Sequence, residues 1–303
     1  MRIGLDIGGT KTDAVVVTDD GALLHRLRLA TGMGPDAVID TAVEAVRRLS
    51  AAIDAPIASF ASVGVGIPGL VVPGSGRVTH AVNLAVEELE LGSILEQRLG
   101  VLVTVENDVK AAALGAWQLL DGAGTMAYLN LGTGVAAGIV ADGRLWRGSS
   151  GIAGEVGHIS VDPRGERCSC GQRGCVETMA AGGPVGAAWG GGAALPVLEM
   201  FDRADAGDER ALALRARLGH GAAAAIRILT LAVDADEIVL GGGLTALGER
   251  LLVVIREALT ESAMGSRFVA SLQLEQRVRL VPMGSPVAAV GAALVGRGEL
   301  SYG

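Results

Sequence analysis

The chain has 303 residues, of which half are apolar, 3% are aromatic and 19% are charged, and its formal net charge is −8. This length suggests two domains, and the apolar content is sufficient for a core packed from aliphatic side chains. The negative charge and the lack of a Lys/Arg cluster exclude a nucleic-acid surface. We also expect no membrane span and no secretory leader, and therefore a cytoplasmic protein.

The first half of the chain alternates expected strands with expected helices. It opens with a three-strand meander around two glycine turns, and a helix with apolar residues at a helical period follows. The expected strands are 3–6, 12–18, 23–29, 62–67 and 101–106, and the expected helices are 36–52, one near 93–96, and 109–120. Ser93 and Glu96 have the spacing of a capping box. The strand 101–106 carries Asn107 and Asp108 at its carboxyl end.

A second meander begins at Thr125 and repeats the layout of residues 2–21. After it, the sequence predicts a long helix, a strand with a glycine turn, and a last helix with Pro286 at its first position. The expected elements are strands 125–131 and 135–140, a hairpin turn at 142–143, a helix near 208–233, a strand at 237–240 and a glycine turn at 241–243. The repetition predicts a duplicated α/β fold.

Three glycine turns and Asp108, in the segment Glu106–Asp108, are candidates for phosphate chemistry. The turns lie in Asp6–Thr12, Leu131–Gly134 and Gly241–Gly243. Each could be an ordinary turn, but two at equivalent points of a duplication are typical of opposing clamps on a polyphosphate. Asp108 could simply cap the helix after it. Phosphoryl transfer, however, needs a carboxylate that accepts the proton of the attacking hydroxyl.

Every cysteine of the chain lies between residues 168 and 175, and a histidine precedes them. His158, Cys168, Cys170 and Cys175 have the spacing H-x9-C-x-C-x4-C. One imidazole and three thiolates fill the tetrahedral shell of zinc, so the expected ion is structural. The alternative is three reduced cysteines with a chance histidine, and their confinement to one loop favours the metal.

Two carboxylates flank this loop. Glu155 lies three residues before His158, and Glu177 lies two residues after Cys175. Solvated surface acids are the ordinary interpretation. Carboxylates held beside a rigid metal loop are better acceptors for sugar hydroxyls, and we favour that role.

In this combination and order, the motifs resemble the ROK family (repressor, open reading frame, kinase), a branch of the sugar kinase and actin-like ATPase fold. The matching segments are DIGGTKT from Asp6, IPG from Ile67, END from Glu106, LGTG from Leu131, GEVGH from Gly154, CSCGQRGCVE from Cys168 and LGGG from Leu240. They span nearly the whole chain. The resemblance implies an α/β, actin-like ATPase (ribonuclease H-like) duplicated fold with ATP in a cleft between two lobes. We expect an N-terminal lobe of 1–115 plus 287–303 and a C-terminal lobe of 116–286 that contains the zinc loop 158–175.

The resemblance also implies residue roles, with Asp108 as the general base toward a sugar hydroxyl. The implied sugar-binding residues are Gly69, Asn107, Asp108, Glu155, His158 and Glu177. The implied phosphate and nucleotide residues are Asp6, Gly9, Thr10, Lys11, Thr133, Gly134, Gly182, Gly242 and Gly243. His158 would bind zinc through one ring nitrogen and the sugar through the other, and Asp6 would orient Mg²⁺ through water. Lys110, Ala136 and Ala137 depart from the family's pattern.

The reaction implied is ATP-dependent phosphorylation of a hexose hydroxyl, with glucose to glucose 6-phosphate as the first choice. N-acetylglucosamine, mannose, fructose and allose would use much the same residues. The expected cofactors are ATP, Mg²⁺ and structural Zn²⁺, and the expected partners are the sugar and ATP, with no nucleic acid, no membrane, and a second copy in a homodimer.

Two alternatives belong to other classes. A non-catalytic sugar-binding or sensory protein is disfavoured because Asp108 and both phosphate turns are present. A repressor of the same family would need a DNA-binding module ahead of the first strand, and we expect none here.

Overall fold

The computed structural model describes residues 1–190 and 193–296, and the chain divides into two compact units. Unit 1 comprises Met1–Ala123, Gly138–Ala153 and the chain from Ser285 on, and unit 2 comprises Gly124–Ala137 and Gly154–Gly284. The lobe boundaries expected from the sequence remain a prediction, and the part of 287–303 beyond residue 296 lies outside the described residues.

Unit 1 is built on a five-stranded mixed sheet with the order β3-β2-β1-β4-β8. Its strands are β1 (Arg2–Ile7), β2 (Lys11–Val17), β3 (Leu23–Ala30), β4 (Val63–Ile67) and β8 (Val103–Asn107). The first three form the antiparallel meander, and β1, β4 and β8 run parallel. Every residue of β4 is buried, which is the usual state of a central parallel strand.

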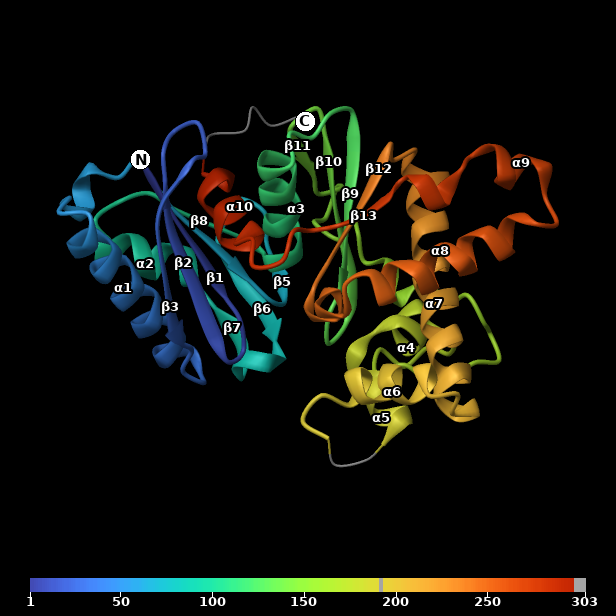
Figure 1. The fold of residues 1–303 in the computed structure, drawn as a ribbon. Coiled ribbons are helices and arrows are strands. Elements are labelled where there is room, and N and C mark those ends of the chain that lie inside the picture. Colours follow the sequence, from blue (N-terminus) through green and yellow to red (C-terminus); the bar gives the residue numbers. More distant parts are fainter. Residues whose placement is uncertain (191–192, 297–303) are drawn as a thin grey trace. The chain divides into compact units, whose positions relative to one another are not determined.

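Four helices cover this sheet. They are α1 (Pro35–Ala52), α2 (Leu91–Leu99), α3 (Asp108–Leu119) and α10 (Val287–Val295). Figure 1 shows α1 and α2 on one side of the sheet and α3 with α10 on the other. The core between α1 and the sheet contains Ile3, Leu5, Val46 and Leu49, all fully buried. The apolar period of the sequence therefore identified the buried face of α1 correctly.

Two helix starts differ from the sequence prediction. The capping box is wrong, because the Ser93 hydroxyl donates to the carbonyl of Glu90 (3.2 Å) and a Glu96 carboxylate oxygen accepts from the N–H of Val103 (3.0 Å). Pro286 is the N-cap of α10 rather than its first residue. Neither helix has a side-chain hydrogen bond from its N-cap residue.

The helices α3 and α10 pack so closely that only glycine fits at the contact. A Cβ atom on Gly291 would lie 1.7 Å from the carbonyl oxygen of Ala111, and one on Gly115 would lie 1.8 Å from that of Val287. The C-terminal helix is therefore a close support for α3, the helix that begins with Asp108.

Unit 1 also contains a small antiparallel sheet that the sequence analysis did not predict. It consists of β5 (Leu70–Val71), β6 (Val78–Ala81) and β7 (Val86–Leu89), in that order. Two 3₁₀ turns, Ile57–Ser59 and Val82–Leu84, complete the connections. Strands of two to four residues are too short to produce a readable alternation.

The second five-stranded sheet has the order β11-β10-β9-β12-β13, which corresponds to the first. Its strands are β9 (Thr125–Leu131), β10 (Val135–Ala141), β11 (Arg144–Trp146), β12 (Glu237–Gly241) and β13 (Val278–Leu280). Along the chain, β10 continues from unit 2 into unit 1. Asp142 and Gly143 both have positive φ, as a tight hairpin turn requires. The duplication expected from the two meanders is confirmed.

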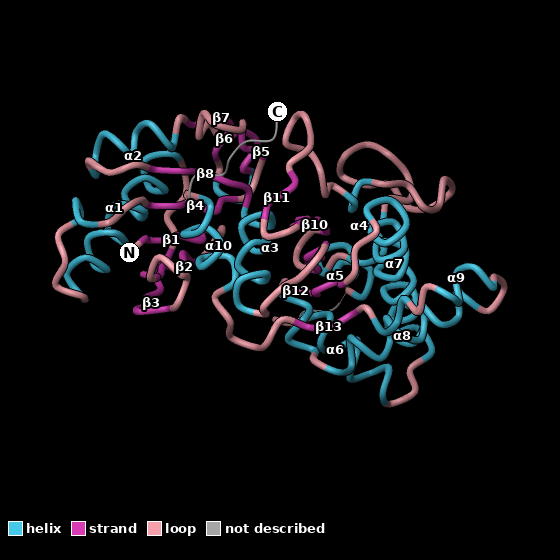
Figure 2. Tube along the Cα trace, turned by 90° about the horizontal axis from the view of Figure 1, so that it is seen from above, coloured by secondary structure: helices cyan, strands magenta, loops and turns pink. Residues whose placement is uncertain are grey.

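The remaining elements belong to unit 2. They are α4 (Val176–Ala180), α5 (Gly182–Trp189), α6 (Pro196–Asp205), α7 (Glu209–Val233), α8 (Glu249–Ala263) and α9 (Arg267–Ser271), with 3₁₀ turns at Val156–His158, Gly243–Leu247 and Leu274–Gln276. Helix α7 is long and apolar enough to cross a membrane by length and composition alone. Half of its most apolar window is buried, and α7 lies beside α4 and α8 (Figure 2), so packing within unit 2 accounts for its apolar character.

Candidate functional site

In unit 1, candidate residues meet at the carboxyl ends of the parallel strands. Asp6 lies near the end of β1, Asn107 ends β8 and Asp108 begins α3. The Asn107 side chain caps α3 by accepting from the N–H groups of Val109 (3.0 Å) and Lys110 (3.2 Å). Its amide group donates to the carbonyl of Gly69 (3.2 Å). Asn107, rather than Asp108, is thus the N-cap, and it joins the end of β8 to Gly69.

Asp108 also takes part in the helix start, because its Oδ1 accepts from the N–H of Val109 (2.9 Å). The side chains of Asp6, Asn107 and Asp108 are all half-buried. A carboxylate in this position, on the first turn of a helix, is favoured by the helix dipole. The arrangement orients Asp108 through local backbone contacts.

The carboxyl of Asp6 lies in an electrostatic environment dominated by other acids. Burial, together with the charges of Asp108 and Asp13, raises the pKa of Asp6 to about 7, while the charges of Lys11 and Arg28 oppose this shift. Mg²⁺ characteristically keeps several waters beside one or two carboxylates, and the charge of Asp108 acts on Asp6 here. Asp6 therefore fits the water-mediated role expected of it.

Asp13 was not singled out in the sequence, yet it is part of this region. It pairs with Asp6 across β1 and β2. Arg28 donates to it through Nη2 (2.8 Å) and Nε (3.0 Å), and Arg26 donates through Nη2 (3.2 Å). Arg26 and Arg28 alternate on β3, beside an acid on β2. This pattern could have identified the ion pairs of Asp13 from the sequence.

The first glycine turn connects β1 to β2. It is closed by a hydrogen bond from the N–H of Gly8 to the carbonyl of Lys11 (3.0 Å), and the carbonyl of Thr10 accepts from Thr31 (3.2 Å). Thr10 and Lys11 are exposed, so both side chains are accessible to an anion at the turn. Gly9 packs against the backbone of Asn83, a neighbour that the sequence analysis did not identify.

In unit 2, the second turn and two distant glycines come together. The N–H of Gly132 donates to the carbonyl of Gly134 (3.0 Å), and the N–H of Gly182 donates to the carbonyl of Gly132 (2.8 Å). Gly242 has φ +86° and packs against the backbone of Leu131. The structure thus gathers Thr133, Gly134, Gly182 and Gly242 around the end of β9, with Gly243 following.

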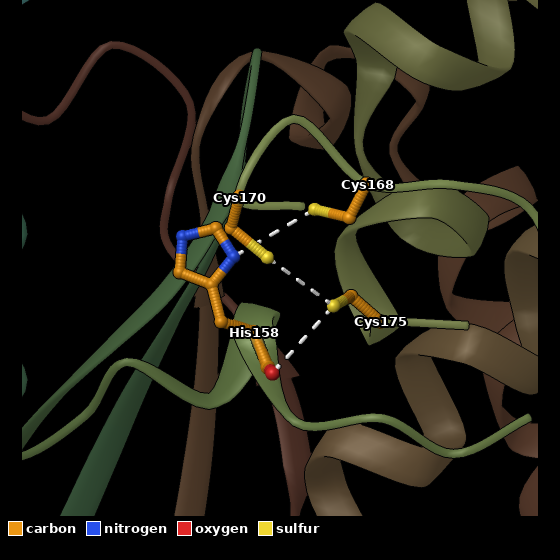
Figure 3. A group of neighbouring side chains, drawn as sticks. All are labelled: His158, Cys168, Cys170 and Cys175. Carbon is orange, nitrogen blue, oxygen red and sulfur yellow. Dashed lines mark hydrogen bonds between the residues drawn. The ribbon is translucent and has the colours of Figure 1, made fainter. Parts of the chain in front are cut away.

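The cysteine loop forms a compact cluster. The ligand atoms of His158, Cys168, Cys170 and Cys175 all lie within 4.8 Å of one another. Figure 3 shows His158 Nδ1 directed toward Cys168 (3.8 Å), while Cys170 and Cys175 place their sulfurs 3.7 Å apart. Two sulfurs at about 2.3 Å from a tetrahedral zinc ion lie about 3.8 Å apart. The chemistry of the donor set and these two separations therefore fit zinc.

The thiols of this cluster differ in acidity. Hydrogen bonds from the backbone and side chain of Gln172 lower the pKa of Cys170 to about 6, whereas burial raises the pKa of Cys175 to about 12. The Cys170 thiolate is thus ready to bind a metal at neutral pH. Metal binding would have to displace the proton of Cys175, which makes the affinity pH-dependent. In residues 1–190 and 193–296, this is the His/Cys/Asp/Glu group compact enough to hold an ion.

The two flanking carboxylates are held differently. Glu177 Oε2 accepts from the N–H of Val135 (3.1 Å), and Oε1 lies 3.9 Å from the sulfur of Cys168. Glu155 precedes the 3₁₀ turn that carries His158.

Two glycines of the same segment pack closely against β10. A Cβ atom on Gly154, which has φ +95°, would lie 1.9 Å from a carbonyl oxygen of β10, and one on Gly157 would lie 2.0 Å from another. These close approaches explain the two glycines of the GEVGH segment.

A model of the ROK family matches residues 2–297. The chain belongs to the ROK family, and its fold is the duplicated actin-like ATPase fold expected from the sequence.

Individual relatives are named as kinases. The chain is 31% identical to a glucokinase from Halalkalibacterium halodurans, with 88% of each chain covered. It is 34% identical to an N-acetylmannosamine kinase from Shigella boydii, with 86% of this chain and 88% of the relative covered. A ROK glucokinase from Streptomyces griseus, solved with glucose and AMPPNP, has a TM-score of 0.79 and 30% identity over 97% of this chain and 98% of that one. A ROK hexokinase from Thermus thermophilus has a TM-score of 0.81 and 31% identity over 97% and 96%.

Proposed function

We propose that this chain transfers the γ-phosphoryl group of ATP to a hexose hydroxyl, with Asp108 as the general base. It is a sugar kinase of the ROK type. The observation that carries the residue assignment is the position of Asp108 at the end of β8, beside an Asn107 that is held on Gly69 and near the acid Asp6.

In the proposed reaction, the Asp108 carboxylate accepts the proton of the sugar hydroxyl as its oxygen attacks the γ-phosphorus. The bond from the γ-phosphorus to the bridging oxygen breaks, and ADP leaves with that electron pair. Lys11, Thr10 and the glycine turns at residues 9 and 132–134 bind phosphate oxygens. Mg²⁺ would neutralise the phosphate charge, and Asp6 would hold the hydrated ion.

The sugar is bound by Gly69, Asn107, Glu155, His158 and Glu177. His158 supports this role, because Nδ1 faces the cysteines and the other ring nitrogen points away from them (Figure 3). The zinc is structural in this proposal, since four protein ligands fill its shell. It would supply rigidity to His158 and to the loop that carries the three cysteines.

Glucose is the first substrate that we propose, because the residue set matches the one expected for glucokinases and a glucokinase is among the relatives. N-acetylmannosamine is the second candidate, favoured by the relative from Shigella boydii. It was absent from the sugars that we considered from the sequence. A homodimer and a cytoplasmic location remain predictions.

The test is ADP release from Mg-ATP with glucose, N-acetylmannosamine, N-acetylglucosamine, mannose, fructose and allose. Asp108→Asn should lower kcat about 10²- to 10⁴-fold, because the base is lost. Asp36→Asn is the matched control, since Asp36 is an exposed acid on the first turn of α1 in the same unit. Wild-type turnover by Asp108→Asn would contradict the base assignment. Absence of turnover on every sugar, in protein that contains zinc, would favour the non-catalytic alternative.

A further inference from the structure

Glu106 forms a buried ion pair immediately before the residues assigned to catalysis. Its side chain is 8% exposed, and its Oε2 accepts from Nε of Arg147 at 2.6 Å. Its Oε1 accepts from the N–H of Asn107 at 2.9 Å. A buried carboxylate is costly unless it is paired and hydrogen-bonded. The pair therefore holds the end of β8 in one position.

Lys110 makes a second charged contact one helical turn further on. It is buried, at 5% exposure, although lysine is among the residue types least often buried. Its Nζ donates to the carbonyl oxygen of Gly151. The partner of the Lys110 ammonium group in this contact is therefore a backbone carbonyl and not a carboxylate. Gly151 belongs to the segment that begins with Arg147.

The two contacts join the same two segments. Residues 106 and 110 lie on either side of Asp108, and their partners, Arg147 and Gly151, are likewise four residues apart. Both segments belong to unit 1. Asn107, between them, is held on Gly69. The backbone around Asp108 is thus fixed by three neighbouring side chains.

We propose that Arg147 and Lys110 are positioning residues for Asp108: together they fix the backbone that orients its carboxylate. Arg147 acts through Glu106 and Asn107, and Lys110 acts through Gly151. Neither residue has a role in substrate binding in the function proposed above. The inference rests on that function in one respect, the role of Asp108 as base.

The test uses Arg147→Met and Lys110→Met. In each variant kcat should fall about 100-fold, which is the loss expected when a reacting group moves by about 1 Å. The KM for ATP should change by less than about twofold, since uniform binding is untouched. Arg147→Lys should recover part of the lost kcat, because it keeps a cation near Glu106. It also provides a test if Arg147→Met does not fold.

The control is Arg98→Met. Arg98 also pairs with an acid in unit 1, Asp40, at 2.7 Å, but both side chains are largely exposed. An exposed pair contributes little, so this variant should keep wild-type kcat. Unchanged kcat in both Arg147→Met and Lys110→Met would overturn the proposal.

Hydrogen exchange separates this proposal from the proposed function, because it needs no turnover. Peptides that cover 106–110 and 147–153 should exchange faster in Arg147→Met and in Lys110→Met than in Arg98→Met. Unchanged exchange would overturn the proposal even if the wild type phosphorylates a sugar. Faster exchange in a protein that phosphorylates no sugar would leave the contacts supported and refute the base role.

Discussion

Gly291 lies where α10 and α3 approach each other most closely, and replacing it by alanine tests how that contact supports the site. The added Cβ would lie 1.7 Å from the carbonyl oxygen of Ala111, whereas real Cβ contacts essentially never fall below 3.0 Å. The helices must therefore separate by at least 1.3 Å, the difference between those two distances. Because α3 begins with Asp108, the base should move with it.

Two terms of opposite sign decide the stability of Gly291→Ala. Alanine is favoured over glycine within a helix by about 1 kcal/mol. Overpacking of a tight contact costs about 1–3 kcal/mol or more, and here the clash is with backbone, which has no rotamer to change. We expect a net loss of about 2 kcal/mol, or about 4–8 °C in Tm for a unit of this size.

Thermal unfolding and steady-state kinetics measure both consequences. A displacement of about 1 Å at the base should lower kcat about 100-fold. Gly265→Ala is the control, since a Cβ there meets nothing within 4 Å. A Gly291→Ala protein with the Tm and kcat of the wild type would refute the argument that α10 sets the position of α3.

Two further predictions concern the acid near the phosphate turn and the metal loop. The pKa of Asp6 is raised from 3.8 to about 7, so the folded protein holds a proton that the unfolded chain has lost, and stability should fall as pH rises through that window. Between about pH 5 and about pH 8, the free energy of unfolding should fall less in Asp6→Asn than in the wild type, by at most about 3 kcal/mol. The same pH dependence of the free energy of unfolding in the two proteins would contradict this prediction. Cys170→Ser should lose zinc and make the loop 158–175 more sensitive to protease, with Ser169→Ala as the control. Unchanged zinc content by elemental analysis would exclude Cys170 as a ligand.

Local patterns predicted most of the elements well. The period of residues 36–52, the apolar strands and the glycine turns recur in the structure with shifts of one or two residues, because each pattern reflects the local burial or turn geometry of its own segment. Helix α8 was also readable, since Leu251, Leu252, Ile255 and Leu259 have a helical period and are buried, but we did not identify it. The strands β5–β7 were not readable, because they are too short.

The metal cluster was predictable for a different reason. Its ligands lie within eighteen residues, and cysteine and histidine have few alternative reasons to gather in one loop. Asp108, by contrast, could be assigned only with the help of the family resemblance, since a first-turn aspartate is also an ordinary helix residue. The helix-capping role proved to belong to Asn107, with a further hydrogen bond to Asp108.

The sequence by itself determined the duplication, the His/Cys cluster and the glycine turns, because each depends on residues that are close along the chain or on a repeated pattern. Only the tertiary structure decided which distant residues support them. Arg147 lies 41 residues from Glu106, and Gly291 lies 180 residues from Ala111. Long-range partners of this kind are chosen by packing and by the need to pair buried charges, and neither leaves a local pattern in the sequence.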